Sequence, residues 1–243
     1  VGAGLKGIRP IYVVRYQGFQ WYNAPIIVNY ACKSKEIWNI SCPIFIRSIA
    51  MEGAIGPVAG SSHHSLFQRM PGSKIISPMT PKEYEYAYKE FMKDDDVYYI
   101  SEHRRSYDNT KELRNIVVED ADFTLFPISI TRFDSEKARI ILEAQGYKIN
   151  IIHQLWIKPF YFKKDWNEAL NRSKFGGMVL DDDYEEGVAS SIAHTMMLSS
   201  NKKVHTLGLD HRTAGFHPEV DNLPPTPEAI AEKVKSIIEN KVN

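Results

Sequence analysis

The residues with the clearest chemical potential lie in one glycine-rich stretch. From Glu52 to Phe67 the chain reads Glu-Gly-Ala-Ile-Gly-Pro-Val-Ala-Gly-Ser-Ser-His-His-Ser-Leu-Phe, so flexible glycines lead into the adjacent imidazoles of His63 and His64. A histidine near neutrality can shuttle protons to a carbonyl or hydroxyl oxygen. We predict that this pair is catalytic. The alternative is that one histidine caps the following helix and the other faces solvent.

Three residues at the end of the first expected strand could hold a flat ligand. Tyr16, Phe19 and Gln20 stand where residues 11–16 pass into a helix. An aromatic ring at such a point can stack on a heterocycle. We assign that role to Phe19, with core packing as the alternative. For the neighbouring Trp21 and Tyr22 we expect core packing.

The remaining charged candidates are weaker. Arg47 could bind an anionic substrate group or make a surface ion pair at a strand end. The carboxylates of Asp181–Asp183 would suit a hard cation, but we expect them to turn the chain towards solvent and cap a helix. His205, His211 and His217 lack a zinc-binding spacing. We therefore predict no metal ligand on this chain.

The elements that must position these residues alternate along the first half of the chain. β-branched and aromatic runs predict strands, and apolar residues at helical spacing predict the helices between them. The expected strands are residues 11–16, 43–49, 74–77 and 97–100, and the expected helices are residues 18–34 and those starting near 63 and 81. The last has a capping signature, with Thr80 as N-cap, Pro81 at the first helical position and Glu83 at the third. This alternation predicts a largely parallel sheet covered on both faces, which binds ligands at the carboxyl ends of its strands.

A second alternation follows a polar stretch between residues 106 and 120. We place the domain boundary there and assign residues 1–115 and 116–243 to two three-layer α/β/α domains. The expected strands are residues 123–128, 148–153, 177–180 and 204–209, and the expected helices are residues 135–145, 187–198 and 226–238. In the last helix Ala229, Ile230, Val234, Ile237 and Ile238 form one apolar stripe.

The composition is that of an ordinary globular protein. Of 243 residues 43% are hydrophobic, and 30 Lys and Arg balance 30 Asp and Glu, so no net field favours nucleic acid or an anionic membrane. No apolar run approaches the roughly 20 residues that cross a bilayer. Cys32 and Cys42 are too few for a disulfide framework. We expect a soluble cytoplasmic protein that binds neither nucleic acid nor membrane.

Several runs together resemble one family, the transketolase-like thiamine-diphosphate enzymes. The runs similar to its pyrimidine-binding domain are Gly4-Leu-Lys-Gly-Ile-Arg-Pro10, Tyr16-Gln-Gly-Phe19, Pro43-Ile-Phe-Ile-Arg47, Gly60-Ser-Ser-His-His64 and Pro71-Gly-Ser-Lys-Ile-Ile-Ser-Pro78. Those similar to its carboxy-terminal domain are Gly177-Met-Val-Leu-Asp-Asp, Gly187-Val-Ala-Ser-Ser-Ile-Ala, Gly208-Leu-Asp210 and Pro225-Thr-Pro-Glu-Ala-Ile230. The paired histidines resemble deoxyxylulose-phosphate synthase, whereas Glu102, His103 and Tyr107 resemble the beta subunit of 2-oxo-acid dehydrogenases.

The resemblance implies thiamine diphosphate as cofactor. It implies that Phe19 stacks on the pyrimidine ring with Tyr16 and Gln20 beside it, and that His63 and His64 face the thiazolium and a small-molecule substrate. The cofactor would supply the organic chemistry and the protein would position it. The substrate would be a ketose, a sugar phosphate or a 2-oxo acid, with transketolase-type transfer of a two-carbon or acyl unit slightly preferred over a dehydrogenase beta subunit.

Two departures from the family pattern bear on this expectation. The family glutamate that protonates the pyrimidine would precede Val1, and we expect the given sequence to omit an amino-terminal piece. The family motif Gly-Asp-Gly, which binds Mg²⁺ and diphosphate, is also absent. The resemblance then implies a separate diphosphate-binding alpha-type subunit that holds most of the Mg²⁺ site. It also implies an α2β2 heterotetramer, in which the beta chains self-associate through their carboxy-terminal domains. A non-catalytic regulatory homologue is the alternative.

Overall fold

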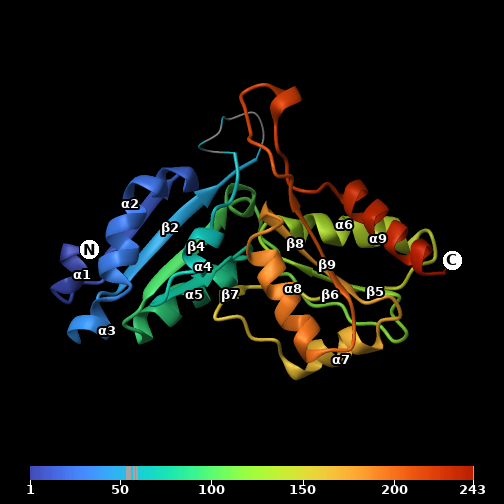
Figure 1. The fold of residues 1–243 in the computed structure, drawn as a ribbon, viewed down its shortest axis with the longest axis horizontal. Coiled ribbons are helices and arrows are strands. Elements are labelled where there is room, and N and C mark those ends of the chain that lie inside the picture. The colour runs from blue at the N-terminus through green and yellow to red at the C-terminus, as the bar shows by residue number, and fades with distance from the viewer. Residues whose placement is uncertain (53–55, 57, 59, 243) are drawn as a thin grey trace. The chain divides into compact units, whose positions relative to one another are not determined.

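The computed structural model describes residues 1–242 except 53–55, 57 and 59. Contacts within the chain divide it into two compact units (Figure 1). The first unit comprises Val1–Glu112, Leu155–Pro159 and Thr213–Asn222, and the second holds the remaining residues. The predicted boundary after residue 115 left both late segments in the second domain. Nowhere in the described chain is a helix both long enough and apolar enough to span a bilayer.

The first unit contains a five-stranded sheet with strand order β1-β2-β4-β3-β7. Its strands are β1 (Ile11–Arg15), β2 (Ile44–Ala50), β3 (Ser73–Ile76), β4 (Val97–His103) and β7 (Trp156–Lys158). The first four are parallel, and β7 joins the edge of β3 antiparallel. The carboxyl ends of β1, β2 and β4 therefore lie side by side at one edge of the sheet.

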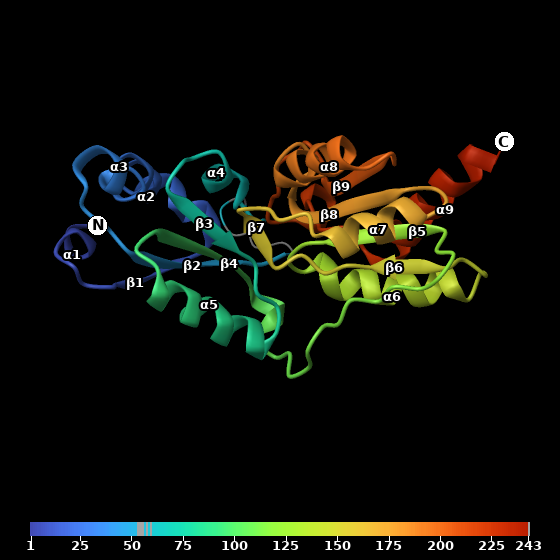
Figure 2. The same cartoon turned by 90° about the horizontal axis from the view of Figure 1, so that it is seen from below.

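Helices cover both faces of this sheet (Figure 2). One face carries α5 (Pro81–Lys93), and the other carries the helical segments that follow β1 and β2. Those segments, with the short helix before β1, are α1 (Gly2–Leu5), η1 (Gln17–Phe19), α2 (Gln20–Ile26), η2 (Ile27–Ala31), α3 (Ser34–Trp38) and α4 (Ser65–Gln68). A short turn, η3 (Arg104–Ser106), follows β4.

Local sequence explains the ends and breaks of these helices. The predicted cap of α5 is confirmed, because Thr80 Oγ1 accepts a hydrogen bond from the Glu83 amide at 3.4 Å. The Glu83 carboxylate accepts from the Met79 amide at 2.9 Å, one residue before the position that a regular capping box would use. The single helix expected over residues 18–34 is instead a 3₁₀ turn, an α-helix and a π turn in succession. Pro25 lies inside it and has no amide to donate to the helical ladder.

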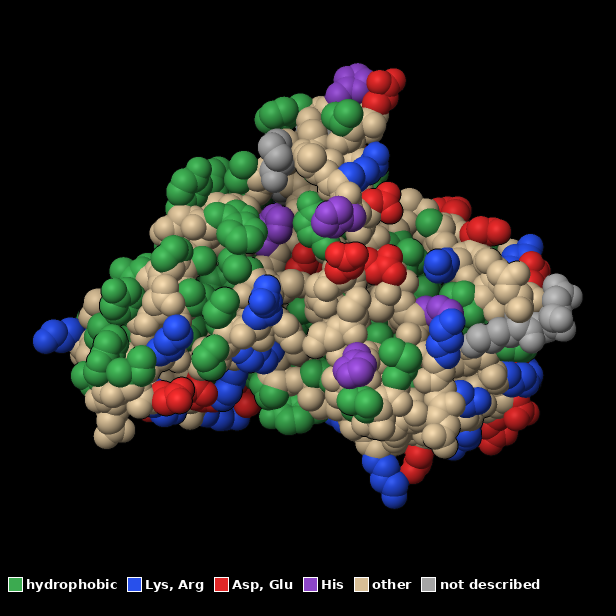
Figure 3. Space-filling view, in the orientation of Figure 1, with side chains coloured by type: hydrophobic (Ala, Val, Ile, Leu, Met, Phe, Trp, Pro, Cys, Tyr) green, Lys and Arg blue, Asp and Glu red, His purple; other side chains and the backbone are tan. Residues whose placement is uncertain are grey.

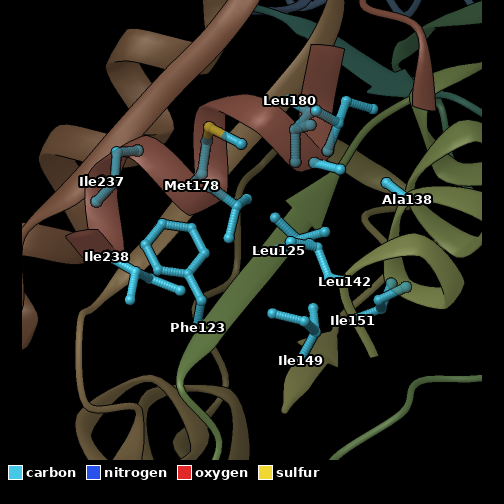
Figure 4. Packing of buried hydrophobic residues seen from close by; sticks show 13 residues of the cluster. Phe123, Leu125, Ala138, Leu142, Ile149, Ile151, Met178, Leu180, Ile237 and Ile238 are labelled. Carbon is cyan, nitrogen blue, oxygen red and sulfur yellow. The ribbon is translucent and has the colours of Figure 1, made fainter. Parts of the chain in front are cut away.

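The second unit contains a parallel sheet with order β6-β5-β8-β9. Its strands are β5 (Phe123–Pro127), β6 (Ile149–Ile151), β8 (Gly177–Tyr184) and β9 (Val204–Leu209), and its helices are α6 (Thr131–Glu143), α7 (Lys164–Arg172), α8 (Val188–Ser199) and α9 (Pro227–Val242). The short turn η4 (Pro218–Val220) belongs to the first unit. Helices α6 and α9 pack together on one face over a cluster that includes Phe123, Leu125 and Met178 (Figure 4). The predicted α/β/α layering is confirmed.

Three expectations for the second unit were wrong. Asp181–Asp183 neither turn outwards nor cap a helix. They continue β8 and are buried, and two of their carboxylates accept hydrogen bonds from the next backbone amide at 2.8 Å. Helix α6 begins at Thr131, four residues early, because its polar first turn is buried. The apolar stripe of α9 contains the buried Ala231. The predicted member Ala229 is exposed and does not belong to it.

Candidate functional site

Strand alternation sorts the polar residues of β2 onto two faces of the sheet. Phe45 packs against Phe91 of α5, and Arg47 shares that face because it lies two residues further along the strand. Ser48 points the other way and meets the residues that follow β1. The structure therefore does not bring Arg47 together with the other predicted site residues.

A buried hydrogen-bond network occupies the face opposite α5. Ser48 of β2 and Ser101 of β4 are direct neighbours in the sheet. Gln17 spans them, and its Nε2 donates to the Ser48 carbonyl at 3.1 Å and to Ser101 Oγ at 2.9 Å. Its Oε1 accepts from the backbone amide of His63 at 2.7 Å. This arrangement holds the loop that carries the histidines onto the sheet.

The two histidines differ in their surroundings. His64 is completely buried, and its Nδ1 lies 3.0 Å from Ser101 Oγ. His63 is half-buried, with Nε2 3.1 Å from Ser61 Oγ and its ring edge-on to Trp21 at 6.1 Å between centroids. His64 also occupies the N-cap position of α4 without a side-chain cap bond, so the helix-cap alternative is not supported by its imidazole.

The aromatic residues after β1 lie mainly at the surface. Phe19 is 44% exposed, so its ring is not part of the core, and Tyr16 is half-buried with the Arg15 guanidinium 5.5 Å from its ring centre. The expected core packing of Trp21 and Tyr22 is wrong, because they are 59% and 82% exposed. These rings are available to a ligand or a partner.

Gln20 follows Phe19 in the chain but points into the first unit. Its side chain is buried, and its Nε2 donates to Ser48 Oγ and to the Tyr99 hydroxyl. Its Oε1 is buried and has no hydrogen-bond partner among the described residues. A buried acceptor left unsatisfied costs about 1–3 kcal/mol, so a ligand that donates to it would gain binding energy here.

Arg47 is engaged on the other face of the sheet. Its Nε and Nη2 donate to the two oxygens of the buried Glu102 carboxylate at 2.7 and 2.8 Å. The Tyr107 hydroxyl donates to the same carboxylate at 2.8 Å. The hydrogen bond to Glu102 raises the pKa of Arg47. A neutralised, bidentate guanidinium of this kind fits the ion-pair alternative better than the anion-binding one.

A second cluster lies at the carboxyl ends of β2 and β4. The Nε2 atom of buried His103 lies 2.6 Å from the Glu52 carboxylate, which also accepts from Arg105 at 3.0 Å. The Arg105 amide donates to His103 Nδ1 at 3.3 Å, so the imidazole presents its Nε2 proton to Glu52. Burial raises the pKa of Glu52, but His103 and Arg105 outweigh it and hold that pKa below its ordinary value.

The glycine-rich loop makes two close contacts among the described residues. The Gly18 amide donates to the Val58 carbonyl at 3.2 Å, and a β-carbon on Gly18 would lie 2.2 Å from that oxygen. Gly56 has a positive φ of 90° and faces the ring of Phe216. Only glycine fits these two positions. Residues 53–55, 57 and 59 of the predicted loop lie outside the described residues.

Sequence reasoning did not identify Gln17, Ser48, Tyr99 and Ser101 as site residues. A signal was present, because each serine interrupts a strand that is otherwise rich in apolar side chains. A hydroxyl on a buried strand requires a hydrogen-bond partner, and that partner had to come from another element.

Exposed apolar side chains are concentrated on the first unit. Figure 3 shows them gathered where Figure 1 draws α2 and α3. We call the following set the outer apolar surface: Ile8, Ile11, Tyr12, Val13, Phe19, Trp21, Tyr22, Ile26, Tyr30, Ile37, Trp38 and Ile40. Tyr22, Ile26 and Tyr30 recur at intervals of four and so share one side of the α2–η2 helix. Apolar patches of this kind mark protein interfaces.

Comparison with protein families identifies the first unit. Residues 1–110 match the pyrimidine-binding domain of transketolase. Residues 1–110 are therefore similar to the pyrimidine-binding domain of the transketolase-like thiamine-diphosphate enzymes. The candidate residues Tyr16, Phe19, Gln20, His63 and His64 all lie within the matched pyrimidine-binding domain.

Curated relatives are beta subunits of larger enzymes. The chain is 25% identical over 210 residues to the 2-oxoisovalerate dehydrogenase subunit beta of Bacillus subtilis (strain 168), which covers 79% of this chain and 63% of that protein. It is 24% identical over 194 residues to the pyruvate dehydrogenase E1 component subunit beta of Acholeplasma laidlawii, covering 72% of this chain and 58% of that protein. The chain thus spans less than two thirds of the length of these relatives.

Solved structures share the fold of the whole chain. A split-gene transketolase, described as an inactive beta4 tetramer, matches with a TM-score of 0.71 and 18% identity over 98% of this chain and 78% of that chain. A transketolase variant from Pichia stipitis matches with a TM-score of 0.70 and 17% identity over 95% of this chain and 34% of that chain. The fold of the chain is therefore transketolase-like over both units.

Proposed function

We propose that this chain is a beta-type subunit of a thiamine-diphosphate enzyme and supplies the pyrimidine half of the active site. The observation that carries the proposal is the pairing of Phe19 with Gln20. The exposed ring of Phe19 is followed in the chain by Gln20, whose buried amide oxygen has no partner among the described residues. An aminopyrimidine offers a flat face to the first and an amino donor to the second.

The residues present fit one half of the cofactor. When bound, thiamine diphosphate supplies a carbanion that adds to a substrate carbonyl. Phe19 would stack on the pyrimidine, Gln20 would accept a hydrogen bond from it, and Tyr16 would close one side. These contacts would orient the cofactor but would not hold its diphosphate. We assign the diphosphate and Mg²⁺ to another chain.

The histidines would handle protons at the substrate. His63 is half-buried and can reach a ligand beside Trp21, whereas His64 is held inside the network by Ser101. A positioned imidazole can give a proton to a carbonyl oxygen or take one from a hydroxyl. In this proposal both act on substrate, and neither contacts the pyrimidine. Arg47 takes no part, because it lies on the opposite face and is neutralised by Glu102.

The partner would be a diphosphate-binding alpha-type subunit that covers the outer apolar surface. This surface includes the proposed cofactor residue Phe19 of η1 and continues with Tyr22 of α2. A partner that covers it would lie beside the proposed pyrimidine site. With self-association of beta chains through their carboxy-terminal domains, the assembly is an α2β2 heterotetramer.

Two reaction classes suit such a subunit. The curated relatives are beta subunits of 2-oxo-acid and pyruvate dehydrogenases, which favours decarboxylation of a 2-oxo acid and transfer of its acyl unit. The adjacent histidines favour transfer of a two-carbon unit from a ketose or sugar phosphate. Turnover of the assembled enzyme with pyruvate, with a branched 2-oxo acid and with a ketose phosphate would separate the two.

Calorimetry on the isolated chain tests the split site. The chain alone should bind thiamine diphosphate weakly, and addition of the diphosphate-binding subunit with Mg²⁺ should produce tight binding. Tyr22→Glu and Tyr30→Glu should block this assembly, because each introduces a charge into the outer apolar surface. Glu85→Gln on exposed α5 is the matched control and should assemble normally. Micromolar binding by the isolated chain would refute the split site.

A further inference from the structure

One short segment carries both the proposed cofactor residues and a contact that holds the histidine loop. The turn η1 ends at Phe19, and Gln20 follows at the start of α2. Phe19 is exposed and Gln20 is buried. The first residue of the turn, Gln17, reaches the loop instead, and its Oε1 lies 2.7 Å from the His63 backbone nitrogen. The place of His63 relative to Phe19 therefore depends on a side chain two residues before Phe19.

The orientation of the Gln17 amide is fixed by its backbone neighbours. The His63 N–H can only donate and so meets Oε1, whereas the Ser48 carbonyl can only accept and so meets Nε2 at 3.1 Å. Nε2 also donates to Ser101 Oγ at 2.9 Å. The side chain is completely buried, so water does not compete for these bonds. Gln17 thus forms a buried bridge from the sheet to the loop.

This bridge is not required to align the sheet. Ser48 and Ser101 already face each other in the parallel ladder between β2 and β4. What Gln17 adds is an acceptor for the loop. The His63 carbonyl accepts from the Leu66 amide at 3.2 Å, where α4 begins. Hydrogen bonds therefore hold His63 on both sides, through its amide and through its carbonyl.

Two further contacts place the loop against the same segment. The Gly18 amide donates to the Val58 carbonyl at 3.2 Å. The His63 ring meets Trp21 of α2 edge-on, with 6.1 Å between centroids. Both the backbone and the ring of His63 therefore contact the segment that carries the proposed cofactor residues.

We propose that Gln17 is a positioning residue that sets where His63 lies relative to the pyrimidine site. It acts through the His63 backbone and touches neither cofactor nor substrate. The inference rests on the proposed function, in which Phe19 stacks on the cofactor and His63 moves a proton at the substrate. Loss of the Gln17 acceptor should displace the imidazole but leave Phe19 and Gln20 in place. A displacement of about 1 Å can lower a rate by about 10²-fold.

Amide hydrogen exchange in the isolated chain, followed by NMR, tests the anchor without cofactor or partner. The His63 amide should exchange slowly in the wild type. In Gln17→Leu, which has a similar volume but no acceptor, its protection should fall by about 10-fold, the factor that one such hydrogen bond contributes. Rapid exchange of the His63 amide in the wild type would overturn the anchor even if Gln17→Leu does not fold.

Two more variants separate the acceptor from the rest of the side chain. Burial favours the protonated form of the carboxyl in Gln17→Glu, which then accepts from His63 and donates to the Ser48 carbonyl. This variant should restore part of the protection that Gln17→Leu loses. Gln20→Leu is the matched control, because Gln20 donates to Ser48 and Tyr99 of the sheet. The His63 amide should stay protected in it, and equal loss of protection in both leucine variants would contradict the assignment to Gln17.

The assembled enzyme should show opposite effects of the two leucine variants. Gln17→Leu should lower turnover by about 10²-fold with little change in the affinity for thiamine diphosphate, and Gln17→Glu should recover part of that turnover. Gln20→Leu should weaken cofactor binding. If Gln17→Leu lowers turnover and cofactor affinity together, Gln17 has a general structural role and the positioning role is wrong.

Failure of this inference and failure of the proposed function are distinguishable. If the wild-type assembly binds no thiamine diphosphate, the proposed function fails, while the exchange of the His63 amide still decides whether Gln17 anchors the loop. If the assembly binds the cofactor and turns over, but a folded Gln17→Leu protein keeps wild-type turnover, only the positioning role of Gln17 fails.

Discussion

Replacing Phe19 by alanine distinguishes a ligand-stacking ring from a core ring. Phe19 is 44% exposed, whereas Phe67 of α4 is fully buried and stacks on Tyr99 at 4.5 Å between centroids. Full burial of a phenylalanine is worth about 1.5–3 kcal/mol. A ring that is a little over half buried should therefore contribute about 1–2 kcal/mol to the free energy of unfolding. Phe67→Ala should cost about 3–5 kcal/mol, since it also leaves a cavity.

The effect of Phe19→Ala on the cofactor should be separate from this small loss of stability. Aromatic stacking adds about 0.5–1.5 kcal/mol beyond area burial, which corresponds to a roughly 2- to 13-fold weaker affinity for thiamine diphosphate in the assembled enzyme. Urea unfolding of the isolated chain and calorimetry of the assembly measure the two quantities. If Phe19→Ala destabilises the chain as much as Phe67→Ala and leaves cofactor affinity unchanged, the stacking role is refuted.

Three further predictions concern other side chains. Glu52→Gln should destabilise the chain at about pH 6, and this loss should shrink as the pH of the urea unfolding experiment is lowered. The folded chain holds the pKa of this carboxyl below its ordinary value, so the stabilisation from its pairing is present above the ordinary pKa and is lost as the pH falls through the lowered one. A loss that does not change with pH would contradict this. Burial raises the pKa of the Cys32 thiol to about 12. Iodoacetamide at about pH 8 should therefore label this thiol only after denaturation. Rapid labelling of the native chain would contradict this, because it would show that the thiol is accessible. Replacing His63 or His64 by Asn should lower turnover about 10²–10⁴-fold with little change in cofactor affinity, whereas near wild-type turnover in the double mutant would leave the pair a purely structural role.

The sequence predicted the order of elements well because strands and helices alternate at regular lengths. The cap at Thr80 depends only on residues within four positions, and it is confirmed. The role of Arg47 was harder to predict from the sequence, since its guanidinium could bind either an anionic ligand or a carboxylate of the protein. The period-two alternation of β2 places it with Phe45, away from Ser48, but its partner Glu102 lies 55 residues away. Such pairing depends on which strands become neighbours.

The network around His64 depends on strand register, which no local pattern encodes. Ser48 and Ser101 meet only because β2 and β4 are adjacent and aligned at these positions. The Asp181–Asp183 run misled for a different reason. Three carboxylates favour solvent on composition alone, yet local backbone amides satisfy two of them inside β8. The surface rings Trp21 and Tyr22 were assigned to the core because apolar residues are buried more often than not.

The first unit is completed by segments that arrive late in the chain. Strand β7 and residues 213–222 belong to the first unit. Most of the second unit precedes residues 213–222 in the sequence. During translation a nascent chain that has reached Glu112 still lacks the strand that pairs with the edge of β3. The β3 edge stays open until residues 156–158 have been made, and synthesis must proceed to Asn222 before the first unit has all its residues. Truncation after Glu112 would leave the β3 edge open permanently.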